Sequence, residues 1–205
     1  MNPPRKQPRR APDTPSRGFH FTLHVRRLAE DMTRRLPQLR HVDLARVAIS
    51  FSQTRADTRH GVYASLTPMR FAGGRMHARR RGRTWAVQRL YDASGHEMLY
   101  ILRFYLPRFL DLPLREKLAT IVHELWHVSP RFDGDLRRHL GRCYAHGPSQ
   151  KHYDVVVERL VDRWLALDPP EELYAFLRHT FAELVARHGR VYGTKIPTPK
   201  LIPVE

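Results

Sequence analysis

The chain has 205 residues, enough for one domain of ordinary size with tails and too few for two full domains. It carries 36 Lys and Arg against 20 Asp and Glu, which gives a formal net charge of +16 at pH 7 and a sequence pI near 10.9. The single Cys143 excludes a disulfide framework and a Cys-rich zinc ribbon. Without a membrane-length apolar run or an apolar segment behind the basic N-terminus, we expect a cytoplasmic protein with no membrane partner.

The N-terminal part of the chain predicts a disordered segment, then a helix and a strand. Residues 1–18 combine Pro with Lys and Arg and lack apolar periodicity, so we expect a disordered basic arm there. In residues 21–36 apolar side chains recur at three- and four-residue spacing until Pro37, which predicts an amphipathic helix. Alternating apolar residues in 47–51 predict a half-buried strand.

The middle of the chain predicts three further strands and a strongly basic connection. Residues 62–67, 85–90 and 98–106 have strand character, and turn-forming residues separate them. The connection between the first two of these strands contains a cluster of arginines: Arg79, Arg80, Arg81 and Arg83.

Three helices are predicted after the strands. The first has Asp111 as its cap and Pro113 as an early residue, and it ends at Ser129-Pro130. Apolar spacing predicts the other two around residues 153–165, before Pro169-Pro170, and 173–185, with an end near Gly189. The order of elements is typical of an α+β domain, here over residues 19–190, followed by an extended, Pro-containing tail at 191–205.

The first of these helices carries the sequence HELWH, from His123 to His127. Two His side chains four residues apart project from one helix face, at a spacing that lets both imidazoles bind one zinc ion. Glu124 lies beside such a metal and is suited to take a proton from an activated water. The pattern therefore predicts the zinc site of an HExxH enzyme.

A catalytic zinc needs a third protein ligand and an open position for water. The residues after His127 offer several candidate ligands: Asp133, His139, His146, His152 and Glu158. Glu158 belongs to an acidic stripe at four-residue spacing, which is typical of a solvated helix face. Gly147 would let the backbone next to His146 approach a metal closely.

The segments HELWH and HGPSQKHYD together resemble the SprT-like zinc metallopeptidases, which include the Spartan group and related phage metallopeptidases. The resemblance implies His123, His127 and His146 as zinc ligands and Glu124 as the catalytic base. It also implies a zincin-like fold, with a small and mostly antiparallel sheet, an active-site helix and C-terminal helices. The longer loop before His146 departs from the family and keeps His139, His152 and Asp133 as alternatives.

These expectations describe a zinc metallopeptidase that cleaves peptide bonds with a zinc-activated water and Glu124 as general base. The strand in residues 99–105 is expected to offer its edge to an extended substrate peptide. A group that stabilises the developing oxyanion is also needed, and the sequence leaves four candidates: Arg142, Tyr144, His152 and Tyr153.

The positive charge predicts contact with DNA phosphates through the basic arm and the arginine cluster at 79–83. Because Spartan-type proteins act on proteins crosslinked to DNA, the resemblance suggests DNA-associated proteins as substrates. The same arginine cluster is equally typical of the solvated tip of a β-hairpin. Two alternative functions stay open: a basic nucleic-acid-binding module with a structural or absent metal, and a metal-dependent hydrolase of non-peptide bonds.

Overall fold

The computed structural model describes residues 18–54, 61–138 and 150–204, with the backbone alone described for 150–152. The predicted basic arm therefore lies, apart from Gly18, outside the described residues. None of the helices in the described part is long and apolar enough to cross a membrane.

The described chain contains four α-helices, several short 3-10 turns and eight strands. The helices are α1 (Phe21–Arg35), α2 (Leu114–Trp126), α3 (Gln150–Ala166) and α4 (Phe181–His188). The strands are β1 (Phe19–His20), β2 (Val47–Gln53), β3 (Ala64–Pro68), β4 (His77–Arg80), β5 (Arg83–Val87), β6 (Tyr100–Leu106), β7 (Val191–Tyr192) and β8 (Leu201–Val204).

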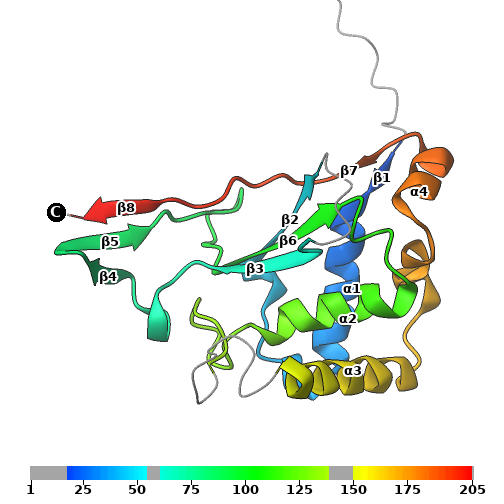
Figure 1. Cartoon of the computed structure of the whole chain (residues 1–205), viewed down its shortest axis with the longest axis horizontal. Coiled ribbons are helices and arrows are strands. Elements are labelled where there is room, and N and C mark those ends of the chain that lie inside the picture. The colour runs from blue at the N-terminus through cyan, green and yellow to red at the C-terminus, as the bar shows by residue number, and fades with distance from the viewer. Residues whose placement is uncertain (1–17, 55–60, 139–149, 205) are drawn as a thin grey trace, which may run out of the picture.

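The predicted α+β class is confirmed, but the strands form three small sheets instead of one. The central sheet has the order β2-β6-β3, with β2 parallel and β3 antiparallel to β6. We call the antiparallel sheet β4-β5-β8 the distal sheet, because it projects away from the helices (Figure 1). The third sheet pairs β1 with β7 in parallel.

Helices α1, α2 and α3 cover one face of the central sheet, whereas α4 lies beside β1 and β7 (Figure 1). Alternate residues of β2 and β6 point into the main core with the apolar faces of α1, α2 and α3: Val47, Ile49, Phe51, Tyr100, Leu102 and Phe104. On the opposite face a smaller core forms around Ala48 and Ile101, and Ile196 from the C-terminal segment packs against it. The central sheet is therefore covered on both faces.

Strand β6 is the middle strand of the central sheet, so the prediction that residues 99–105 offer a free edge is wrong. The outer side of β2 is also occupied, because the Phe51 N–H donates to the Thr194 carbonyl over 3.1 Å. Strand β3 pairs with no other described strand on its outer side, and it lies against α2. The available edge of the central sheet is thus β3.

Two helix predictions need correction. Asp111 does not cap α2, which begins after Pro113; its carboxylate accepts the Phe181 N–H at the start of α4 over 3.1 Å. The helix predicted in residues 173–185 is divided into two 3-10 turns and α4. Thr180 explains the division, because its side chain and that of Glu183 form a capping box that starts a new helix.

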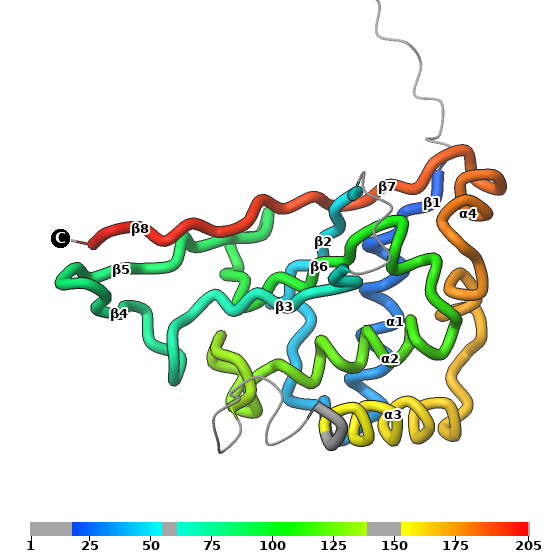
Figure 2. Tube along the Cα trace, viewed as in Figure 1, coloured from blue at the N-terminus to red at the C-terminus, as the bar shows by residue number. Residues whose placement is uncertain are grey.

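The C-terminal segment crosses the molecule from one end to the other (Figure 2). It begins in β7 beside β1, passes over the central sheet and ends in β8 as the outer strand of the distal sheet. The Arg103 guanidinium holds its middle part, with donations to the Ile196 carbonyl over 2.6 Å and to Thr198 Oγ1 over 2.9 Å. The predicted extended tail thus takes part in two sheets.

Candidate metal centre

The two His side chains of the HELWH segment converge at the end of α2. His123 lies in the last turn of this helix, and His127 directly follows it with helical backbone angles, φ −69° and ψ −17°. Their Nε2 atoms are 3.1 Å apart, and the ring planes meet at 81°. The predicted pairing of these two imidazoles is therefore present in the fold.

This separation fits a zinc ion. With Zn–N bonds of about 2.0–2.1 Å, nitrogens at this distance subtend roughly 100° at the metal, close to the tetrahedral angle. Imidazole nitrogen is also a donor that zinc prefers. The same separation suits an N–H···N hydrogen bond between neutral rings, so a metal assay has to distinguish the two states.

Tyr153 on α3 holds both imidazoles in place. Its ring stacks on His127 with centroids 5.1 Å apart and meets His123 edge-on at 4.8 Å. Its hydroxyl donates to the backbone carbonyl of His123 over 3.1 Å. Burial raises the pKa of Tyr153, which is 2% exposed. Of the predicted oxyanion candidates, this residue is instead a buried support for the His pair.

Arg137 fixes the C-terminal end of α2 from the loop that follows it. Its guanidinium Nε donates to the Trp126 carbonyl over 2.6 Å, and its carbon Cζ lies 3.8 Å above the Trp126 ring. Its backbone N–H donates to the His127 carbonyl, also over 2.6 Å. These contacts satisfy carbonyls that a helix end leaves without intrahelical partners, and they hold His127 in its helical conformation.

Glu124 is buried between the His pair and strand β3. It is 8% exposed, and burial raises the pKa of its carboxyl to about 7, against a hydrogen bond from the Leu66 backbone that lowers it. A carboxyl that titrates near neutral pH is suited to proton transfer. The predicted base is thus placed beside His123 and held by the available edge of the central sheet.

A groove of about 590 Å³ opens beside His123 and Glu124. It lies between β3, α2 and α3, and its walls include Tyr63, Ala64, Leu112 and Val157. The groove also contains three acidic residues: Glu116, Asp154 and Glu158. It gives an extended ligand access to the predicted base.

The described side chains place no third candidate ligand beside the His pair. No three His, Cys, Asp or Glu side chains of the described residues come together as a metal site, so neither Asp133 nor Glu158 joins the His pair. Asp133 instead pairs with Arg131 at 3.2 Å, and Glu158 pairs with Arg115 at 2.7 Å. The remaining candidates, His139, His146 and the side chain of His152, lie outside the described part of the structure.

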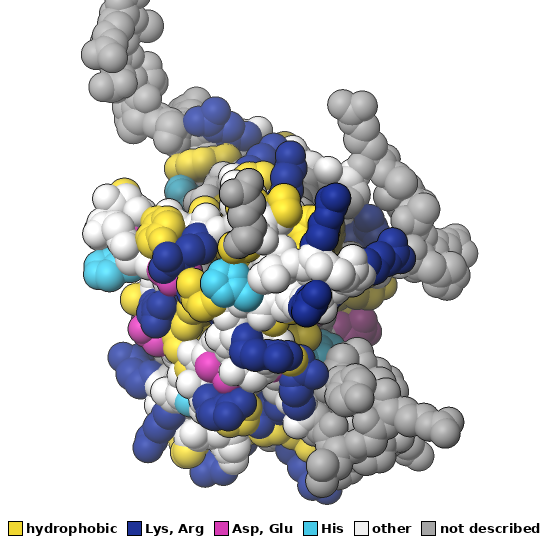
Figure 3. All heavy atoms as spheres, turned by 90° about the vertical axis from the view of Figure 1, so that its left-hand side faces the viewer, with side chains coloured by type: hydrophobic (Ala, Val, Ile, Leu, Met, Phe, Trp, Pro, Cys, Tyr) yellow, Lys and Arg dark blue, Asp and Glu magenta, His cyan; other side chains and the backbone are white. Residues whose placement is uncertain are grey.

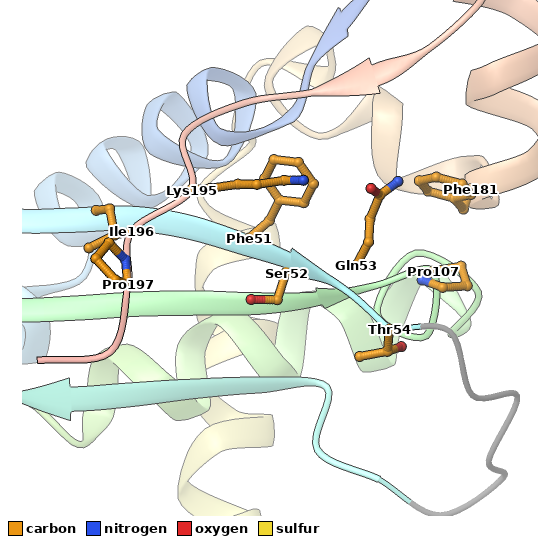
Figure 4. Close-up of a pocket in the computed structure, with 9 residues that line it drawn as sticks. All are labelled: Phe51, Ser52, Gln53, Thr54, Pro107, Phe181, Lys195, Ile196 and Pro197. Atoms are coloured by element: carbon orange, nitrogen blue, oxygen red, sulfur yellow. The ribbon is translucent and has the colours of Figure 1, made fainter.

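A second hollow, of about 790 Å³, is separate from the His pair (Figure 4). It lies between the end of β2, the C-terminal segment and the start of α4, with Phe51, Lys195 and Phe181 among its lining residues. The Lys195 ammonium lies 5.3 Å from the centre of the Phe51 ring. This hollow is not lined by His123, Glu124 or His127 and is therefore not part of the predicted metal site.

Two features of the site were missed by the sequence reasoning. One is the role of β3, whose Leu66 hydrogen-bonds Glu124; the strand itself is evident from alternation, but its neighbours are not. The other is Arg137, which the sequence shows only as one arginine among many in a basic loop. The position of Arg137 shortly after an HExxH helix is a weak signal. Its contact with Trp126 depends on the loop folding back onto the helix end, which the sequence does not show.

No family model, curated protein or solved structure matches the chain. The geometry and chemistry of the chain's own residues therefore carry the functional argument.

Proposed function

We propose that the chain is a zinc-dependent metallopeptidase of the HExxH type. The observation that supports this most directly is the 3.1 Å separation of the His123 and His127 Nε2 atoms at the end of one helix. The third ligand in this proposal is His146, with His139 and His152 as alternatives. The resemblance to Spartan-type proteins adds DNA-associated proteins as the substrate class.

The proposed reaction uses the chain's residues in separate roles. A bound zinc ion supplies Lewis acidity, which lowers the pKa of water and polarises a carbonyl. Glu124 is the proton carrier: its carboxylate accepts a proton from the attacking water and passes it to the leaving amine. The hydrogen bond from Leu66 orients this carboxylate, and Tyr153 and Arg137 keep the two imidazoles converged.

The edge of β3 is suited to bind the substrate backbone. The Tyr63 carbonyl accepts from Tyr105 and the Met69 N–H donates to Leu99, so alternate residues of this segment face β6. By the same alternation, the backbone groups of Ala64 and Leu66 face away from β6. Because the Leu66 N–H donates to Glu124, the Leu66 carbonyl and the backbone groups of Ala64 remain for a substrate. An extended peptide that pairs with this edge lies in the groove beside His123 and Glu124.

Metal analysis together with a protease assay tests the proposal. We expect the purified wild-type chain to hold about one zinc per chain by mass spectrometry and to hydrolyse unfolded casein. Glu124→Gln should keep the zinc and lose at least about a hundredfold in kcat, because general acid–base catalysis supplies that much. His123→Ala and His127→Ala should lose both zinc and activity.

His77→Ala is the matched control, because it removes an exposed imidazole of β4 that is not part of the pair. It should leave zinc content and turnover unchanged. Wild-type protein without stoichiometric metal, or full activity in Glu124→Gln, would contradict the proposal.

A further inference from the structure

The distal sheet and its connections carry positive charge without any carboxylate. Residues 72–91 contain several arginines and no Asp or Glu, and neither do residues 193–204, which supply β8. The face toward which this sheet points shows many Lys and Arg side chains and few acidic ones (Figure 3). No acidic side chain within these segments therefore balances the charge of their arginines and lysines.

Strand register brings two arginines and one tryptophan to the same face of the distal sheet. Arg80 is directly opposite Arg83, and Ala78 is opposite Trp85. Because side chains alternate along a strand, Arg83 and Trp85 share a face with Arg80. A hollow of about 550 Å³ on this face is lined by Arg80, Arg81, Arg83, Trp85 and Leu201.

This arrangement is unfavourable for the isolated sheet. Like charges directly opposite each other on neighbouring strands repel. None of the ion pairs among the described residues involves Arg80, Arg81 or Arg83, all of which are exposed. The Arg80 guanidinium has a ring as its neighbour, at 5.6 Å from the centre of Phe71. A bound polyanion would remove the repulsion.

Trp85 indicates which class of polyanion fits this face of the distal sheet. Its ring is half-buried in the hollow, with its Nε1 donating to the Arg80 carbonyl over 3.4 Å, which turns the polar edge of the indole toward the sheet. An aromatic face flanked by guanidinium groups is the combination that binds unstacked bases together with their phosphates. A duplex offers phosphates but no base faces to such a ring, because its bases are stacked on each other.

We propose that this face of the distal sheet binds single-stranded nucleic acid. The Trp85 ring stacks on one base, and Arg80, Arg81 and Arg83 bind the phosphates on either side of it. Leu201 of β8 closes the apolar side of the hollow. This surface uses none of the residues of the metal centre, so it stands or falls independently of the proposed peptidase activity.

Fluorescence anisotropy with a labelled oligothymidylate of roughly 20 nucleotides tests the proposal on the full chain. Replacing Arg80, Arg81 and Arg83 together by Ala should raise Kd at least about tenfold. It should also reduce the slope of log K against log salt by about 2, since each lost phosphate contact on a single strand contributes about 0.7.

The control variant replaces three exposed arginines elsewhere, Arg40, Arg159 and Arg163, by Ala. It loses the same net charge and keeps residues 1–17, so their contribution is equal in both variants. Its Kd should change by less than about threefold. Equal weakening in both triple variants would overturn the proposal, because net charge alone would then explain the binding.

Trp85 provides the second readout. Stacking should quench part of the tryptophan fluorescence of the wild type, and this quenching should be absent in Trp85→Phe, which keeps a ring and most of the affinity. Trp85→Ala should raise Kd for the single strand about tenfold, within the range for one base–aromatic contact, at an unchanged unfolding midpoint. Absence of quenching, or a Trp85→Ala variant that binds the single strand as tightly as wild type, would overturn the proposal.

Discussion

The hydroxyl of Tyr153 donates to the backbone carbonyl of His123 over 3.1 Å, while the ring of the same residue stacks on His127. One side chain from α3 therefore contacts both members of the His pair. The contact joins α3 to the last turn of α2, where the His123 carbonyl also accepts the His127 N–H over 3.3 Å. The convergence of the imidazoles thus depends on packing between two helices as well as on their spacing in sequence.

Tyr153→Phe isolates the contribution of this hydrogen bond. The variant keeps the ring and loses the donor, so the His123 carbonyl loses its partner in Tyr153. We expect the free energy of unfolding to fall by about 1 kcal/mol, and zinc affinity to fall about tenfold because the ligand is held less firmly. Urea unfolding and competition with a zinc chelator measure the two effects. Tyr174→Phe, which alters an aromatic packed on Trp164 instead, is the control.

The third ligand can be identified by metal content. Of His146→Ala, His139→Ala and His152→Ala, we expect the first alone to lose zinc, because removing one of three protein ligands empties a catalytic site or strongly weakens it. Zinc retained in His146→Ala and lost in one of the other two variants would move the third ligand to that residue. The measurement is zinc per chain after dialysis against a weak chelator.

Peptide N-methylation tests the role of β3 without any change to the protein. If substrate N–H groups donate to the outward-facing carbonyls of Ala64 and Leu66, methylating those substrate nitrogens should raise KM about tenfold, since each lost hydrogen bond is worth about 1 kcal/mol. The same peptide methylated at the alternate nitrogens should keep its KM. Equal values for both peptides would show that β3 does not bind the substrate backbone.

The lowered pKa of Glu97 predicts that the free energy of unfolding decreases in acid. Hydrogen bonds from Arg89 and then Arg70 lower the pKa of its carboxyl to about 2. Since the folded pKa lies below the unfolded one, the stabilisation is fully present above about pH 5 and is lost as the pH falls toward 2. Solvent screening limits it to about 1 kcal/mol.

Glu97→Gln should therefore be less stable than wild type by about 1 kcal/mol at pH 7 and equal to it near pH 2. Chemical denaturation across this pH range measures the difference. Glu172→Gln, an exposed glutamate without an ion pair among the described residues, should differ little from wild type throughout. A constant difference between Glu97→Gln and wild type at every pH would contradict the assignment.

Local periodicity was sufficient to predict the elements around the site. Helix α1 was expected over residues 21–36 and spans Phe21–Arg35, because its apolar stripe and Pro37 define both its buried face and its end. The shared helix face of His123 and His127 likewise follows from their four-residue spacing. Such features depend on residues a few positions apart, and the sequence displays them directly.

Strand partners could not be predicted in the same way. Residues 98–106 were correctly expected to contain a strand, yet their position in the middle of the sheet depends on pairing with β2 and β3, which are distant in sequence. The tail at 191–205 shows no alternation strong enough to predict β8, whose residues are all exposed and which forms by pairing with β5. Asp is a residue type that commonly caps helices, but tertiary packing directs the Asp111 carboxylate to the start of α4.

The course of the C-terminal segment has a consequence for how the molecule is made. This segment supplies β7 as the partner of β1 and β8 as the second partner of β5, which also pairs with β4. It also gives β2 a backbone acceptor at Thr194. During translation these partners emerge from the ribosome after residues 1–190, so three strands wait with open hydrogen-bonding groups until then. A nascent chain halted before residue 191 would thus expose several sites for wrong pairing at once.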